Sequence, residues 1–172
     1  MQKILTLAAA IIVFAGAQAA ALDEIQFLPT RTKLDSDKNR AGSDTTVETK
    51  EIAYTVKVTS RSFKELLDVT VKYNVFYEDS QLGSTAEPEI KCSAGSHVFP
   101  SLLTNKPVEF ATETIKLDKA SLDPGWYFAS GASSKAKDKV VGLWFKAFDS
   151  SGKQIGEYAN PTTVAKKRKW KD

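Results

Sequence analysis

The chain has 172 residues, of which 42% are hydrophobic and 26% are charged, and its formal net charge is +3. This ordinary globular composition excludes wholesale disorder and a polytopic membrane protein. With one Cys and one His, the chain cannot be a disulfide-stapled scaffold or hold a cysteine-cluster metal site.

The first 21 residues have the pattern of a secretory signal peptide. A short basic start precedes an apolar run, Ile4 to Phe14, and Ala17-Gln18-Ala19 is a small-x-small cleavage pattern. The run of ~11 residues is shorter than the ~20 that a membrane-spanning helix needs, and an uncleaved anchor at the membrane surface is the weaker alternative. We therefore expect export to the periplasm or the outer cell surface. Residues 22–165 should form one domain, and residues 166–172 a basic tail.

Period-two alternation in the mature chain predicts strands rather than helices. Ile52 to Thr59 and Val69 to Tyr77 alternate apolar with polar residues and are rich in β-branched and aromatic side chains. Val140 to Phe148 is apolar on both faces, which predicts a central strand. Gln154 to Asn160 follows it after a hairpin turn at 149–153. Weaker candidates are Glu24 to Leu28, Glu89 to Phe99 and Val108 to Leu117.

Seven or eight strands at this spacing predict an all-β, antiparallel β-sandwich of the immunoglobulin-like or fibronectin-like type. The pattern Leu122-x-Pro-Gly-x-Tyr127 resembles the tyrosine corner of these domains, in which a Tyr hydroxyl turns back onto upstream backbone. A polar stretch, Gly131 to Lys139, delays the strand expected after this corner. The structural alternative is an eight-stranded outer-membrane barrel, but only two strands alternate cleanly and the chain ends in Trp-Lys-Asp.

Few residues suggest catalysis. A Cys92 thiolate would need His97 as a base, but five residues along a strand place the two ~17 Å apart and on opposite faces. A small buried thiol and a surface His are the simpler interpretation, and an intermolecular disulfide is a third. The pairs Glu78-Asp79 and Asp35-Asp37 are expected to be solvated turn carboxylates. Motifs of metalloproteases, serine hydrolases and nucleotide-binding loops do not occur, so we predict a non-enzymatic protein without catalytic residue, metal or cofactor.

Trp144 and Tyr158 are candidate binding residues. If Phe148 pairs with Gln154 across the turn, Trp144 faces Tyr158 on an outer face, where the two rings could stack on a sugar or a partner. This register also places Glu157 on the apolar face, which suggests a bulge. The alternative is a cross-strand pair covered by a loop and worth ~0.2–1 kcal/mol to the sheet.

Trp126 lies beside the expected corner and is either a plug in it or an exposed platform. Binding of a glycan through these aromatic residues requires exposed, coplanar rings, whereas an assembly role requires an apolar edge or interface.

The last seven residues carry five basic side chains and one acidic one, and the rest of the mature chain has 18 basic and 20 acidic residues. Such a tail attracts anionic lipid, polyanionic glycan or nucleic acid. The alternative is a solvated, frayed terminus. The tail has no apolar pattern to bury, so we expect its removal to leave the stability nearly unchanged. The candidate binding residues of the tail are Lys166, Lys167, Arg168, Lys169, Trp170 and Lys171.

Three segments, Pro124 to Tyr127, Val140 to Phe145 and Gly156 to Pro161, are similar to small exported immunoglobulin-like proteins of verrucomicrobial gut bacteria (Akkermansia) that are encoded near type IV pilus genes. The resemblance covers the mature chain. It implies an immunoglobulin-like sandwich, export and a pilus-associated or surface-interaction role, and it supplies no site residues.

We therefore predict an exported, non-enzymatic interaction protein at the cell envelope. The alternative is a glycan-binding module that uses exposed aromatics. The expected partners are envelope or pilus proteins, or a glycan, with contact to an anionic surface through the basic tail; nucleic acid is not expected.

Overall fold

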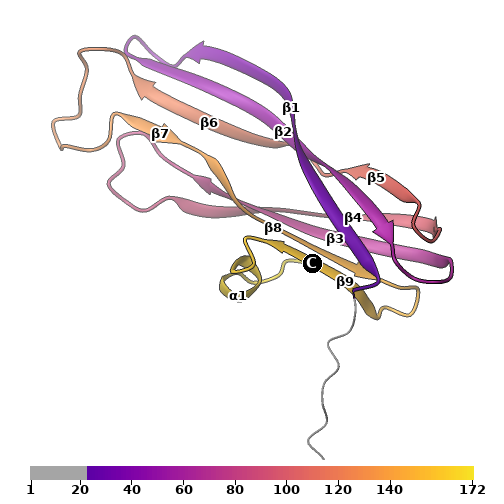
Figure 1. Cartoon of the computed structure of the whole chain (residues 1–172). Helices are drawn as coiled ribbons and strands as arrows, with labels where there is room; N and C mark the ends of the chain where they lie inside the picture. Colours follow the sequence, from indigo (N-terminus) through magenta and orange to yellow (C-terminus); the bar gives the residue numbers. More distant parts are fainter. Residues whose placement is uncertain (1–22) are drawn as a thin grey trace, which may run out of the picture.

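The computed structural model describes residues 23–172, so the predicted signal peptide, residues 1–21, lies outside the described residues. The described residues form two antiparallel sheets in a sandwich (Figure 1). The first sheet contains β1 (Ile25–Arg40), β2 (Thr45–Ser60), β5 (Pro107–Ala111), β6 (Ile115–Leu122) and β7 (Lys135–Lys137). The second contains β3 (Leu66–Asp79), β4 (Glu89–Leu102), β8 (Lys139–Phe148) and β9 (Gln154–Asn160). The predicted all-β sandwich is confirmed, with nine strands among these residues instead of seven or eight.

The strand order places the chain in the immunoglobulin-like class of sandwiches. The first sheet has the order β1-β2-β6-β7, with β5 also beside β2, and the second has the order β4-β3-β8-β9. In the usual lettering, β1 is strand A, β2 is B, β3 is C, β4 is C′, β8 is F and β9 is G, and β7 is an additional strand. Strands A, B and E then share one sheet and C′, C, F and G share the other, as in these domains. Strand E is here divided into β5 and β6.

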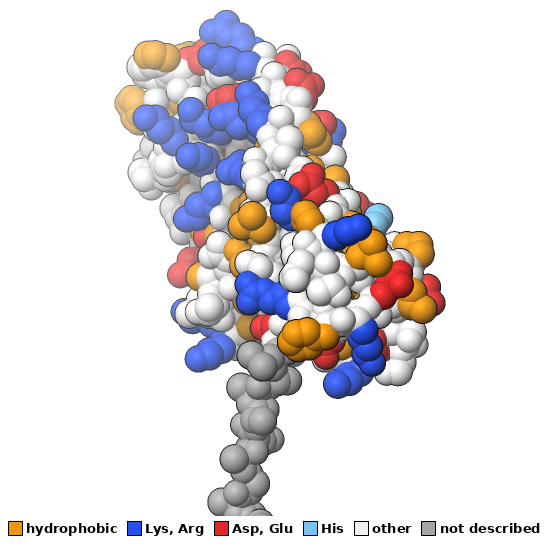
Figure 2. All heavy atoms as spheres, turned by 45° about the vertical axis from the view of Figure 1, so that its right-hand side comes forward, with side chains coloured by type: hydrophobic (Ala, Val, Ile, Leu, Met, Phe, Trp, Pro, Cys, Tyr) orange, Lys and Arg blue, Asp and Glu red, His pale blue; other side chains and the backbone are white. Residues whose placement is uncertain are grey.

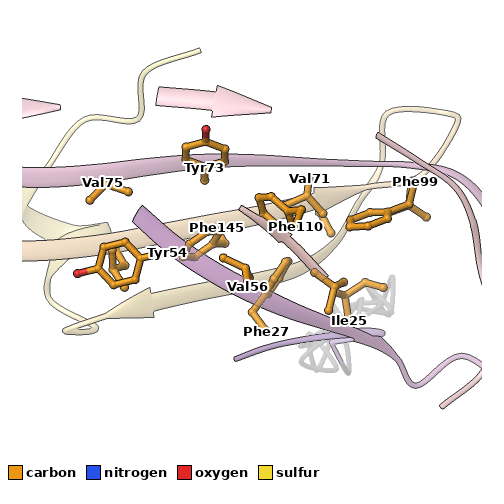
Figure 3. Close-up of a cluster of buried hydrophobic side chains, with 14 of the residues drawn as sticks. Ile25, Phe27, Tyr54, Val56, Val71, Tyr73, Val75, Phe99, Phe110 and Phe145 are labelled. Atoms are coloured by element: carbon orange, nitrogen blue, oxygen red, sulfur yellow. The ribbon is translucent and has the colours of Figure 1, made fainter. Parts of the chain in front are cut away.

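The core lies between the inner faces of the two sheets, where alternate residues of β2, β3 and β8 meet. Phe145 is fully buried, and its ring centroid is 5.8 Å from that of Phe27 in the first sheet. Figure 3 shows these rings among Val56, Val71 and their neighbours. The alternation predicted for β2 and β3 is confirmed, and β8 is a central strand between β3 and β9.

Strand E is interrupted at Thr112, and side chains hold the interruption in place. The Tyr54 amide donates to the Thr112 hydroxyl, and the Thr112 amide donates to the Tyr54 carbonyl, both at 2.9 Å. The next amide, that of Glu113, donates at 2.9 Å to the hydroxyl of Tyr73, a buried residue of β3 in the opposite sheet. The break is thus tied to both layers.

The predicted tyrosine corner is wrong. The Tyr127 side chain is 82% exposed, in the loop that follows β6, and within residues 23–172 its hydroxyl forms no hydrogen bond. The polar stretch after it forms β7, which pairs with β6, so β8 begins only at Lys139. Tyr127 therefore lies too far along the chain from strand F to pack at its start.

One end of the first sheet extends beyond the core (Figure 1). We call this part of the sheet the arm; it consists of residues 31–40 of β1, 45–51 of β2, 116–122 of β6, and β7. No residue of the β1 and β2 portions is buried, because polar and charged residues occupy both faces. The expectation that Glu24 to Leu28 forms a short strand is therefore corrected: it is only the start of β1. Asp35 and Asp37, expected in a loop, are strand residues of β1.

Candidate functional site

The C-terminal segment lies on the outer face of the second sheet (Figure 1). A short helix, α1 (Val164–Lys167), follows β9, and its Val164 is buried against Gly142 of β8. A Cβ atom at Gly142 would lie 2.3 Å from Cγ2 of Val164, so only glycine permits this close approach. The strand and the helix are thus fitted to each other.

Two tryptophans form the centre of this contact. The Trp170 ring packs edge-to-face against Trp144, with centroids 5.1 Å apart and planes at 83°. The Lys146 ammonium lies 4.7 Å from each ring centroid, within cation–π distance. The Trp144 indole N–H donates to Oε1 of Glu157 at 2.6 Å, which satisfies its polar edge.

Polar contacts hold the last two residues to the same face. The Asn74 side-chain amide donates from Nδ2 to the Lys171 carbonyl at 3.1 Å. Oδ1 of Asp172 accepts from the Lys72 ammonium at 3.0 Å and from the Trp170 indole at 3.2 Å. The hydrogen bond from Lys72 is the main reason why the pKa of Asp172 is lowered. The expectation of a solvated, frayed tail with nothing to bury is wrong, because Val164 and Trp170 provide an apolar contact that the charged residues around them conceal.

The docked tail still presents its charge to solvent. Four consecutive basic residues, Lys166 to Lys169, are exposed, and none of them forms an ion pair with another described residue. The basic cluster of the tail is therefore held at a fixed place on the sandwich.

The aromatic residues predicted to act together lie apart. Phe148 pairs with Gln154 as expected, and the suggested bulge is present between Ala147 and Phe148. The bulge shifts the register, so Trp144 pairs with Ala159 and Tyr158 pairs with Phe145. Tyr158 consequently packs toward the core, with its ring 6.1 Å from that of Phe145. The predicted Trp144–Tyr158 pair is wrong.

Trp126 lies elsewhere again, in the loop beyond β6 at the end of the arm, with its side chain 59% exposed. Trp126, Trp144 and Tyr158 therefore occupy three separate environments: a loop, the tail contact and the core margin. They do not form a coplanar platform.

Cys92 and His97 lie on opposite faces of β4, as predicted. The Cys92 thiol donates to Oδ1 of Asn74 at 3.2 Å on the outer face, and burial raises its pKa. His97 is exposed and stacks on Phe110, with centroids 5.1 Å apart. Because a nucleophilic cysteine needs a lowered pKa and a nearby base, this arrangement does not activate the thiol.

The paired carboxylates at the end of β3 form cross-strand ion pairs instead of standing free in solvent. Glu78 pairs with Lys139 at 3.1 Å, and Asp79 pairs with Lys91. Within residues 23–172, no group of three or more His, Cys, Asp or Glu side chains is arranged to hold a metal ion.

One end of the sandwich carries an apolar surface that strand periodicity does not predict. We call it the apolar end, and it is made of Phe63, Leu67 and Leu103. Their exposed fractions are 103%, 59% and 42%. The loops meet there because Ser60 bridges to Thr104 and Leu67 pairs with Ser101. Figure 2 shows hydrophobic side chains gathered in the lower part of the visible face.

A hollow of about 600 Å³ on the outer face of the second sheet is lined in part by Thr70, Val98 and Phe148. Thr70 pairs with Val98 on one side and with Phe148 on the other, three residues along the strands from Leu67 and its partner Ser101. Val98 is 54% exposed. The exposed apolar surface therefore continues from the apolar end onto the outer face.

Fold and surface together define an immunoglobulin-like sandwich that carries a docked C-terminal segment and an exposed apolar end. No family model matches the chain. A search of curated proteins finds no match. Among solved structures, the chain is similar to one described as "X-ray structure of Northeast Structural Genomics Consortium target SoR45", with 10% sequence identity and a TM-score of 0.34 over 81% of this chain and 88% of that one. A likeness at this level supports no conclusion about fold or function.

Proposed function

We propose that this chain is an exported, non-enzymatic interaction domain of the cell envelope that binds a protein partner through the apolar end. The observation that carries the proposal is the exposure of Phe63, Leu67 and Leu103 at the same end of the sandwich. Large apolar side chains that gather on a surface are typical of protein interaction sites. An assembly role requires such a surface, whereas glycan stacking requires coplanar aromatics, which the fold separates.

Export is supported by the signal-peptide pattern of residues 1–21. A periplasmic or outer-surface location and an association with type IV pili belong to the same proposal; the pilus association rests on the resemblance alone. No helix within residues 23–172 has the length and apolar character needed to cross a bilayer. The separation of Cys92 from His97 supports a non-enzymatic role.

Site-specific photo-crosslinking in the cells that make the protein tests this proposal. A benzophenone amino acid at Phe63 should give discrete adducts with an envelope protein. The same probe at Tyr127, which is 82% exposed in the loop at the end of the arm, is the matched control and should give none of these adducts.

Leu67→Ser and Leu103→Ser should weaken the adducts without lowering the melting temperature, because both side chains are already exposed. Identical adduct patterns from positions 63 and 127, or none from position 63, would contradict the proposed interface.

A further inference from the structure

We propose that one face of the arm binds a linear acidic polysaccharide. This face, the basic face, is the side of the arm that continues the core side of the sheet. The site is independent of the apolar end and of the tail, and it is not apparent from the overall charge of the chain.

Strand pairing brings the basic face together from four strands. Lys33 lies opposite the core residue Ile52, Lys38 lies opposite Glu48, and Lys119 of β6 lies opposite both Glu48 and Lys137 of β7. Residues directly opposite each other in a ladder share a face of the sheet. Eight basic residues therefore share this face with the carboxylates of Glu48 and Asp123. At its β7 edge, Lys135 and Lys137 also line a hollow with Asp79, Glu87 and Glu89 of the β3–β4 hairpin. The basic residues that carry the argument are Arg31, Lys33, Lys38, Arg40, Lys50 and Lys119, with Lys135 and Lys137 beside them on β7. Figure 2 shows Lys and Arg side chains gathered over the upper part of the molecule.

Much of this charge has no partner within the chain. Arg40 pairs with Asp123 at 2.7 Å, and Lys50 and Lys119 share Glu48 at 3.0 and 3.9 Å. Within residues 23–172, the other five form no ion pair: Arg31, Lys33, Lys38, Lys135 and Lys137. Placing Lys119 directly across from Lys137 opposes folding, since like charges at paired positions destabilise a sheet. A bound anion would remove that repulsion.

The opposite face of the same strands carries the opposite charge. Asp35 pairs with Glu51, and Asp37 and Asp118 both pair with Thr49, so four carboxylates share this side with one basic residue, Lys116. Side chains that serve solubility alone mix both signs on one surface. The arm instead separates them by face.

The chemistry of the basic face favours a carbohydrate over a membrane or a nucleic acid. Its large apolar residue at a paired position, Leu117, is buried. The exposed apolar side chains nearby, Leu34 in the β1 bulge and Trp126 in the loop, do not form the continuous apolar face by which an amphipathic element inserts into a bilayer. The strands of the basic face carry no exposed aromatic ring, so they offer no series of rings for stacking successive bases; the single exposed indole, that of Trp126, lies in the loop beyond them. On β1, Arg31 lies ~7 Å from Lys33 and Lys38 lies ~7 Å from Arg40, with ~17 Å between the two pairs, and neighbouring strands are ~5 Å apart. The β1 row from Arg31 to Arg40 extends over ~30 Å. A flexible polymer with a sulfate or carboxylate on successive sugars can follow such a row.

The loop at the end of the arm adds a feature that suits sugars. Asp123, which binds Arg40, begins the loop that carries Trp126, and Trp126 donates its amide to the Asp123 carbonyl at 3.1 Å. Its indole is 59% exposed. An exposed indole next to the charged row offers an apolar surface to the ring of a terminal sugar.

Binding of a heparin decasaccharide to the purified protein tests the proposal. Lys33→Gln with Lys38→Gln should lower the affinity about tenfold near physiological salt. Two matched pairs remove the same charge elsewhere: Lys57→Gln with Lys116→Gln on the outer face of the first sheet, and Lys166→Gln with Lys167→Gln in the tail. Both should stay within about twofold of the parent. In the unsubstituted protein, the decasaccharide should also protect Lys33 and Lys38 from acetylation, a readout that does not depend on any variant folding.

Three outcomes would overturn the proposal. An equal loss in all three pairs would show that heparin senses only net charge. A loss confined to the tail pair would assign the site to the tail. Tighter binding of duplex DNA or of vesicles containing phosphatidylglycerol, with the same sensitivity to Lys33 and Lys38, would assign the face to another class of ligand.

Discussion

Tyr73 performs the task that the sequence pattern assigns to Tyr127. Its ring lies in the core, and its hydroxyl accepts a hydrogen bond from the Glu113 amide of the opposite sheet at 2.9 Å. The Pro-Gly-x-Tyr pattern identifies a turn, but a turn fixes neither the length of the following loop nor the direction of the Tyr side chain. Tyr73 carries no local signal beyond its place in an alternating strand, because its partner is 40 residues away.

We expect Tyr73→Phe to destabilise the fold. The substitution keeps the aromatic ring but leaves a partly buried amide without its acceptor, which costs about 1–3 kcal/mol. Chemical denaturation should show a lower midpoint with an unchanged slope. Tyr127→Phe removes an exposed hydroxyl and is the matched control, with a midpoint equal to that of the parent. The opposite pattern would restore the tyrosine corner.

Trp144 illustrates why a residue on a correctly predicted strand can still be placed wrongly. The strand, its central position and the Phe148–Gln154 pair all follow from alternation and turn chemistry. The bulge beside Phe148 then shifts the pairing of every residue that follows, because a shift of one residue exchanges the two faces of a strand. The shape of the sheet determines such a bulge, so local sequence can suggest it without fixing the new register.

At the level of elements, the tail shows how composition can conceal packing. Lys and Arg dominate residues 166–172, and their number predicts a solvated terminus. The apolar contribution comes from Val164 and Trp170, and the surface that receives them is assembled from β3, β4 and β8. Gly142 within an otherwise apolar strand was the available signal, since a glycine inside a strand often marks a close approach of another segment.

We expect Trp170→Ala to loosen the tail. Loss of the edge-to-face contact with Trp144 and of the contact with Lys146 should cost about 1–2 kcal/mol in the free energy of unfolding. Labelling of Cys92 by a thiol reagent at neutral pH should also become faster. Burial is the main cause of the raised pKa of Cys92, so exposure lowers the pKa and increases the thiolate fraction.

Two controls separate packing from charge in this experiment. Lys169→Ala, beside Trp170 but exposed, should change neither stability nor labelling. Lys171→Ala removes a charge that lowers the pKa of Cys92, so labelling should become slower. Unchanged labelling in Trp170→Ala would mean that the tail does not cover the thiol.

For the whole molecule, the two halves of β2 should differ in local stability. Residues 53–59 lie over the core, whereas residues 45–51 belong to the arm, and both halves have hydrogen-bonded neighbours on either side. No residue of the arm half is buried, so its amides should open more readily. Hydrogen exchange followed by mass spectrometry should show exchange about tenfold faster or more for peptides from residues 45–51. Equal protection would mean that another surface covers the arm in solution.

The sheet architecture follows from the sequence, whereas the apolar end and the basic face do not. The reason is the same for these two surfaces. Alternation shows that Leu66-Leu67 and Leu102-Leu103 must each place one leucine outward, but only the meeting of the two loops makes a patch of them. Likewise, Arg31-x-Lys33 and Lys135-x-Lys137 each mark one strand face, while pairing through β2 and β6 unites them. The net charge of the chain is a sum over both faces of the arm and conceals their separation.

The interruption at Thr112 has a mechanical consequence for the arm, because it lies where the arm joins the sandwich. β2 runs unbroken from the arm into the sandwich, while its neighbour on one side is cut into β5 and β6, so a displacement of the arm need not shear β5 from β2. The Thr112 and Tyr73 hydroxyls hold this point to both layers, and torque applied to the arm by a bound polymer would be borne there.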